Sequence, residues 1–308
     1  MLLASALLVP GCALAWSNGG YSANIADPDY GTHDWLAEKA LDLLPETEKQ
    51  YLVKNNVSYV YGTELPDKPK SQGGYGDTTN HHIYYNDDKT PQDNASAKRA
   101  EEEYQKAMGA LRAKDYANAS MFAGSMAHYI CDVAVFSHVM GKYTEWGEET
   151  HHSDYEDWVN SKTDSNDSSY FVITPDGALN NISAYQAALD IAYDTTFGVG
   201  GDKGCKWMDE DVDHEDPTRA YDTGSQAFID RVSQSLNLAV NKLADVLHTL
   251  ALEANYTGSI TTSPPPEPDD NTIDRNTIII GAVVAVAIVL LIMFLLRKKG
   301  KKRRRRKK

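Results

Sequence analysis

Twenty consecutive residues without a charged side chain, TIIIGAVVAVAIVLLIMFLL at 277–296, constrain this chain more than any other feature. A helix rises about 1.5 Å per residue, so the stretch is long enough to cross the roughly 30 Å hydrocarbon layer of a bilayer. Eleven of the next twelve residues, 297–308, are Lys or Arg. By the positive-inside rule, the sequence predicts a single-pass cell-membrane protein whose basic tail is cytoplasmic and whose remainder lies outside.

The basic tail is interpreted as a stop-transfer signal that also anchors to lipid headgroups, in preference to a nucleic-acid binding site. We therefore expect no nucleic-acid partner for it. The tail holds 11 of the 30 Lys and Arg residues, so the rest of the chain carries 19 basic against 44 acidic residues. An outer portion this acidic attracts cations and repels polyanions at long range.

Residues 1–15, MLLASALLVPGCALA, have the form of a secretory signal peptide, because they are apolar, too short to span a bilayer and end in A-L-A. Cleavage after them would make Trp16 the first residue of the mature chain. The alternative is a lipoprotein signal, which would place a lipid on Cys12. The mature chain then keeps Cys131 and Cys205, between which a disulfide is permitted outside the cell.

The region between these termini divides into a body and a stalk. Residues 257–276 are rich in Pro, Thr, Ser and acids, which predicts an extended stalk. The body, 16–256, has mostly helical periodicity and predicts a single all-α domain. The polar, Asp-rich stretches 53–96 and 196–221 are expected to be loops. The expected helices are 33–44, 97–114, 117–139, 153–161, 179–195 and 222–254.

Metal-ligand residues recur at helical spacing in the body. In HYICDVAVFSH, His128 and Asp132 are four residues apart, so one helix face would present both to a single ion, and His138 follows six residues later. His152 and Glu156 repeat the four-residue spacing in HHSDYEDW. Nitrogen and oxygen donors without thiolates suit zinc in an oxidising compartment. Three further candidates stand upstream, namely His33, Asp67 and His82.

Each feature alone has a commoner explanation, since a His–Asp pair usually lies on a surface and adjacent histidines usually lie in loops. The ordered set is more specific, and it resembles the zinc-dependent phospholipase C family. It is also similar to the single-strand-specific zinc nucleases, which share that fold. The resemblance covers most of 16–256 and rests on Trp16, His33, Asp67, His82, His128, Asp132, His138, His152 and Glu156.

The resemblance implies three zinc ions. One would be bound by Asp67, His82, His128 and Asp132. A second would be bound by His33, by Asp132 as a bridge, and by the free amine and carbonyl oxygen of Trp16. The third would be bound by His138, His152 and Glu156. His81 or His151 could take the place of its neighbour, although the H-x3-E spacing favours His152.

The function implied is that of a membrane-tethered phospholipase C, which hydrolyses the glycerol–phosphate ester of phospholipids through a metal-bound hydroxide. Asp67 is the candidate catalytic residue, because a carboxylate at that position can orient or deprotonate the attacking water. Glu156 in place of Asp, the long gap between Trp16 and His33, and the membrane tether favour lipids over nucleic acid.

Departures from the choline-preferring members of the family modify this expectation. Gly19, Lys68 and Thr79 stand where those enzymes have an acid and two aromatic residues that would hold a quaternary ammonium. We therefore expect weak choline preference, with Lys68 meeting an anionic headgroup. The segment DVAVFSH also lacks the proline usual before His138.

Three other functions stay open at this stage. They are a single-strand nuclease, a phospholipase D that acts on glycosylphosphatidylinositol anchors, and a non-catalytic zinc-binding surface module. The acidic charge, the stalk and six N-x-S/T sequons would suit the last of these equally well. The sequons are Asn56, Asn94, Asn118, Asn166, Asn181 and Asn255. The sequence carries no signal for an oligomeric state.

Overall fold

The computed structural model describes residues 22, 24, 26–198, 203–212 and 225–258, all of which belong to one compact unit, Met1–Ile260. The expected signal peptide 1–15, Trp16, the apolar segment 277–296 and the basic tail lie outside these residues, as does nearly all of the stalk. Within the described ranges, none of the helices is both long and apolar enough to cross a membrane.

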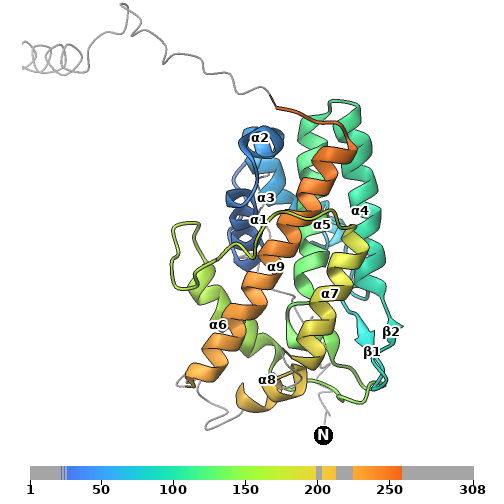
Figure 1. The fold of residues 1–308 in the computed structure, drawn as a ribbon, viewed down its shortest axis with the longest axis vertical. Coiled ribbons are helices and arrows are strands. Elements are labelled where there is room, and N and C mark those ends of the chain that lie inside the picture. The colour runs from blue at the N-terminus through green and yellow to red at the C-terminus, as the bar shows by residue number, and fades with distance from the viewer. Residues whose placement is uncertain (1–21, 23, 25, 199–202, 213–224, 259–308) are drawn as a thin grey trace, which may run out of the picture. The chain divides into compact units, whose positions relative to one another are not determined.

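The described residues fold mainly into helices, as expected (Figure 1). They are α1 (Thr32–Asp42), α2 (Glu46–Lys54), α3 (Asn56–Glu64), α4 (Ala95–Arg112), α5 (Tyr116–Asp132), α6 (His152–Thr163), α7 (Ala184–Phe197), α8 (Cys205–Val212) and α9 (Gln226–Glu253). Two short 3-10 helices, η1 (Lys70–Gln72) and η2 (Phe136–Val139), and an antiparallel pair of strands, β1 (Tyr84–Tyr85) and β2 (Pro91–Asp93), complete them.

Helix α5 lies at the centre of the domain, where it packs against α3, α4, α7 and α9. Its crossing with α3 depends on two glycines. A Cβ on Gly62 would lie 2.1 Å from the carbonyl oxygen of Met121, and one on Gly124 would lie 2.0 Å from that of Tyr59. Because no side chain fits there, the two backbones approach closely, and the end of α3 comes beside the second half of α5.

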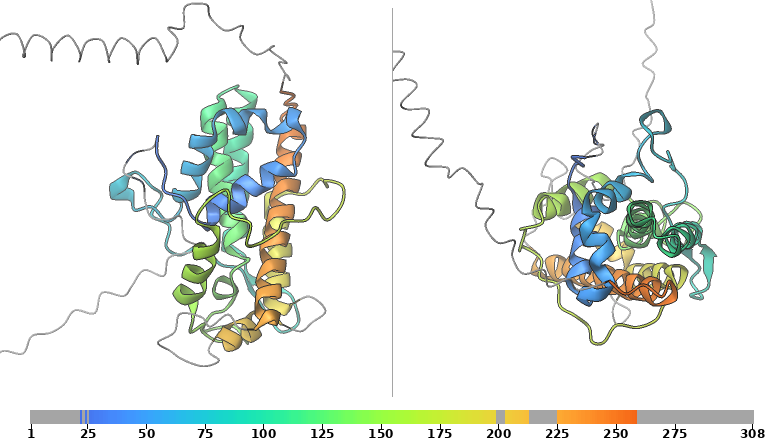
Figure 2. Two further views of the ribbon diagram at one scale, coloured as in Figure 1. Left: turned by 90° about the vertical axis from the view of Figure 1, so that its left-hand side faces the viewer. Right: turned by 90° about the horizontal axis from the view of Figure 1, so that it is seen from above.

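Helix α9 supplies the long apolar face that closes the other side of the core. Its residues Phe228, Val232, Leu236, Leu243 and Leu250 are buried at steps of four or seven residues, which is the period of one helix face. The helix packs against α1, which crosses it, and against α7 (Figure 2).

Three expectations from the sequence are wrong in detail. The helix expected over 117–139 ends at Asp132, where Ala134 and Val135 bond back to the carbonyls of Cys131 and Asp132 and turn the chain into η2. The loop expected at 53–96 contains α3, whose last six residues are all buried and therefore show no periodicity. The loop expected at 196–221 contains α8.

Candidate metal centre

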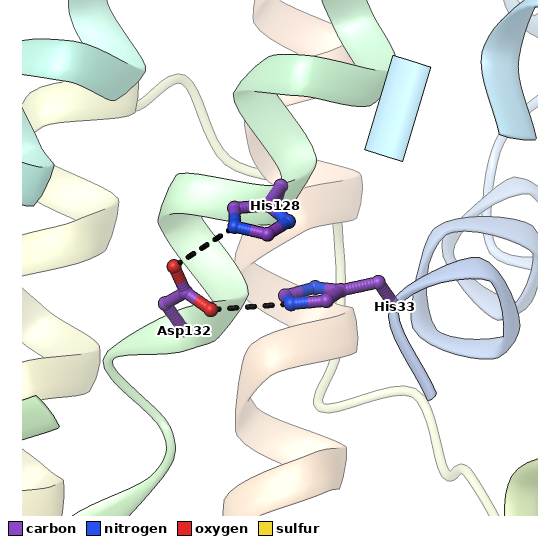
Figure 3. Close-up of side chains that lie close together, drawn as sticks. All are labelled: His33, His128 and Asp132. Carbon is purple, nitrogen blue, oxygen red and sulfur yellow. Dashed lines mark ion pairs between the residues drawn. The ribbon is translucent and has the colours of Figure 1, made fainter. Parts of the chain in front are cut away.

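Helix ends bring the first group of candidate ligands together. His33 stands in the first turn of α1, and His128 and Asp132 stand in the last turns of α5 (Figure 3). His33 Nε2 lies 3.1 Å from Asp132 Oδ1, and His128 Nε2 lies 3.2 Å from Asp132 Oδ2. The two imidazoles stack with their centroids 4.0 Å apart. All three side chains are buried, so the two oxygens of one carboxylate face separate imidazoles in the interior.

A second group overlaps the first. His81 Nδ1 lies 2.6 Å from Asp132 Oδ2 and 3.2 Å from His128 Nε2. Asp67, which follows α3, places Oδ1 3.5 Å from His81 Nε2 and 3.7 Å from His128 Nε2. Asp67, His81 and His128 each offer one donor atom within 4.8 Å of the others, as do His33, His128 and Asp132.

The third group is the one expected, with His138 from η2 and His152 and Glu156 from the first turns of α6. Glu156 Oε1 lies 2.9 Å from His152 Nε2 and 3.6 Å from His138 Nε2. Glu149 lies on the opposite side of the His152 ring, with Oε1 3.3 Å from Nδ1. The chain turn after Asp132 therefore delivers His138 to its partners without the proline that the sequence lacks.

His82 is the one described candidate that the structure does not bring into a cluster, and its neighbour His81 takes the place. Ile83 N bonds to the carbonyl of His138, and Ser96 N bonds to the carbonyl of His82, so the segment is held on both sides. In this position His81 faces Asp132 and His128. His82 pairs with Asp93 at 3.2 Å and stacks on Tyr84. Trp16 lies outside the described residues, and its role stays a prediction.

Burial and proximity shift the ionisation of these groups strongly. Burial alone would lower the pKa of His81, but Asp132 and Asp67 raise it to about 9. Burial raises the pKa of Glu156 to about 8. Burial would also raise the pKa of Asp132, yet the imidazoles of His128 and His81 hold it well below its ordinary value. A cation bound among these groups would compete with protons for the same donor atoms.

Several buried atoms in these clusters are left without a hydrogen bond of proper geometry from the described residues. They are both ring nitrogens of His33, Oδ1 of Asp132 and Nε2 of His138. Unpaired buried polar atoms are costly, and metal ions would satisfy one nitrogen of His33, Oδ1 of Asp132 and Nε2 of His138. The outer nitrogen of His128 is already committed, because Nδ1 donates to the carbonyl of Thr63 at 2.8 Å. This donor set fits zinc, whose histidine ligands usually donate their second nitrogen to a carbonyl or carboxylate.

The second and third groups open into one cleft of about 1050 Å³, lined by Asp67, His81, His138 and His152. Lys70, Tyr84, Lys142 and Tyr143 line it as well.

The expectation that Lys68 meets a headgroup is wrong, because Lys68 is only 3% exposed. Its Nζ donates to the carbonyl of Ser22 at 2.7 Å and lies 3.4 Å from Glu64 Oε2, one helical turn away.

Comparison with known proteins identifies a family and a shared fold. The sequence profile of the family described as zinc dependent phospholipase C matches residues 32–196. Among solved structures, the alpha toxin of Clostridium absonum is 17% identical with a TM-score of 0.51, over 73% of this chain and 64% of that one. The alpha-toxin of Clostridium perfringens, avian strain SWCP, is 14% identical with a TM-score of 0.51, over 78% and 66%. The chain thus spans about two thirds of each toxin, and the likeness shows a shared fold. No curated protein matches by sequence.

Proposed function

Because the chain belongs to the zinc-dependent phospholipase C family, we propose that it hydrolyses the glycerol–phosphate ester of phospholipids outside the cell, tethered through residues 277–296. The observation that carries the proposal is three groups of nitrogen and oxygen donors, of which the second and third open into one cleft. A phosphodiester in that cleft would lie against Asp67 and His81 on one side and against His138 and His152 on the other.

The proposed ligand sets follow the geometry, with His81 in place of His82. Asp67, His81, His128 and Asp132 would hold one ion. His33 and Asp132, with the amine and carbonyl of Trp16, would hold a second, and His138, His152 and Glu156 a third. Zinc bound there would supply Lewis-acid chemistry, which lowers the pKa of water and neutralises the charge of the phosphate.

Asp67 is the residue proposed to act on the attacking water. Its side chain is 11% exposed at the wall of the cleft, whereas Asp132 is fully buried behind it. Asp67 can therefore reach a water beside the substrate, orient it and accept its proton. Asp132, His33 and His128 are enclosed and would only hold and align. Attack on phosphorus then breaks its bond to the glycerol oxygen, which leaves as diacylglycerol after protonation.

Replacement of Asp67 with Asn should lower kcat/KM by about 10²–10⁴-fold, the usual contribution of a positioned general base. The amide keeps an oxygen donor, so the zinc content should fall much less than the rate. Steady-state hydrolysis and elemental analysis on the same preparation measure both. Asp87→Asn removes an exposed carboxylate that does not line the cleft, and it should leave both values unchanged. Wild-type turnover in Asp67→Asn would exclude the role.

Substrate preference is expected to favour anionic phospholipids over phosphatidylcholine. Lys70 and Lys142 line the cleft and can meet an anionic headgroup, whereas the position of Lys68 is closed. The purified full chain should release diacylglycerol from phosphatidylglycerol vesicles faster than from phosphatidylcholine vesicles, and a chelator should stop both. A faster reaction with phosphatidylcholine would contradict the expected preference.

The same assay separates the competing functions. Chelator-sensitive cleavage of single-stranded DNA without cleavage of lipid would identify a nuclease instead. Phosphatidic acid as the product, rather than diacylglycerol, would indicate phospholipase D chemistry. If neither lipid, DNA nor a simple aryl phosphodiester is hydrolysed by the zinc-loaded chain, the protein is a non-catalytic zinc-binding module.

A further inference from the structure

The carboxylate of Asp77 joins the segment that carries His81 to helices α4 and α5. Its Oδ1 accepts bonds from Thr79 N at 3.2 Å, Asn80 N at 3.1 Å and Asn80 Nδ2 at 2.9 Å. A carboxylate that binds the backbone two and three residues on fixes a tight turn. The turn ends directly before His81, so this one side chain sets where the segment presents the imidazole.

The backbone of the same residue holds the outer nitrogen of His81. His81 Nε2 donates to the carbonyl of Asp77 at 2.8 Å, and the ring therefore presents Nδ1 to Asp132 and His128. Which nitrogen of a histidine binds a metal is decided by the bond that the other nitrogen makes. In His81 that bond is possible only while the turn from Asp77 to His81 keeps its shape.

The second oxygen of Asp77 is anchored on two buried or half-buried side chains. Tyr129, which follows His128 on α5, donates from Oη to Asp77 Oδ2 at 3.0 Å. Arg99 on α4 places Nε 3.4 Å from the same oxygen, and its guanidinium lies 5.0 Å from the centroid of the Tyr129 ring. Arg99 is held in turn by Glu103, whose Oε1 lies 2.9 Å from Nη2 and whose side chain is buried.

We infer that Asp77 is a positioning residue of the proposed zinc centre, which fixes His81 with Nδ1 facing inward through a turn that Tyr129 and Arg99 anchor. The inference rests on the proposed function, because it concerns a ligand of that centre. Asp77 lines the same cleft, but His81 stands between it and Asp132, so it acts through the imidazole rather than on the substrate.

Asp77→Ala should weaken zinc binding about 10- to 100-fold, which is the usual cost of removing a group that orients a metal-bound histidine. The full chain is loaded with zinc and titrated with a competing chelator. The ion bound through His81 should be lost at a lower chelator concentration than in the wild type, whereas the ion bound by His138, His152 and Glu156 should be retained. Cobalt substitution gives a second reading, because a misplaced His81 changes the visible absorption of the cobalt protein. Asp88→Ala is the matched control. It removes an exposed carboxylate that makes the same kind of turn, accepting from Thr90 N at 2.9 Å, outside the cleft.

If Asp77→Ala does not fold, two further variants test whether Asp77 positions His81. Asp77→Asn keeps the oxygen that caps the turn but places an amide against Tyr129 and Arg99, so it should weaken zinc binding to a smaller extent. Arg99→Met removes the anchor and should act in the same direction, whereas Arg112→Met on the same helix, which loses a bond to the carbonyl of Glu253, should not. Wild-type zinc affinity and cobalt absorption in the folded variants would overturn the inference alone. A wild-type chain that binds no zinc would instead refute the proposed function.

Discussion

Asp132→Ala is expected to abolish hydrolysis, with a loss on the order of 10³-fold or more. A metal ion commonly supplies several kcal/mol of transition-state stabilisation, and each 1.36 kcal/mol is a factor of ten in rate. In the proposed ligand sets Asp132 serves two ions, because Oδ1 faces His33 while Oδ2 faces His128 and His81. Its removal therefore deletes one donor from each of two zinc sites and leaves the three imidazoles without the carboxylate that joins them.

The measurement is zinc content and turnover on the same folded protein, compared with Asp245→Ala. Asp245 is also a buried helical aspartate, and it accepts a bond from Asn180 N at 2.8 Å. It lies on α9, which carries none of the proposed ligands. The control should lose stability through that bond while it keeps three zinc ions and its rate. An Asp132→Ala chain that retains three zinc ions and wild-type turnover would contradict the shared-ligand assignment.

The features of the site that could be predicted from the sequence are those set by local spacing. His128 with Asp132, and His152 with Glu156, are four residues apart on helices, and a helix turn brings such pairs together whatever surrounds them. The overall all-α architecture followed from apolar periodicity in the same way. The long helix α9 was the clearest case, since one of its faces is buried along its whole length.

What could not be predicted depends on contacts between distant segments. His81 and His82 are adjacent, so the local sequence does not tell which of them faces the other ligands. Backbone bonds from Ile83 to His138 and from Ser96 to His82 decide it. Helix α3 is not apparent from the sequence because the residues of its second half are all buried. Such a helix lacks the three- to four-residue apolar period that marks a helix at the surface. The position of Lys68 likewise depends on Ser22, 46 residues earlier, whose carbonyl accepts the bond from its Nζ.

An extra residue before Trp16 is expected to remove one zinc ion and most of the activity. A peptide bond converts the terminal amine into an amide whose nitrogen has no available lone pair, so the chelating pair proposed for the second zinc is lost. The earliest described residues form bonds close to the first donor group. Ser22 N donates to Glu64 Oε2 at 3.0 Å, and Asp29 N donates to Glu64 Oε1 at 3.2 Å. These bonds anchor the early chain beside Thr63, whose carbonyl accepts from His128.

The comparison that isolates the amine uses two matched chains. One is extended by a single Gly before Trp16, and the other begins at position 16 with Trp16→Phe. The second keeps a free amine and a carbonyl, so it should keep three zinc ions, whereas the extended chain should keep two and lose on the order of 10²-fold or more in kcat/KM. Mass spectrometry of each amino terminus verifies the start. Three zinc ions and full turnover in the extended chain would show that His33 and Asp132 hold their ion without the terminus. That ion would then need other ligands in place of the terminal amine and carbonyl.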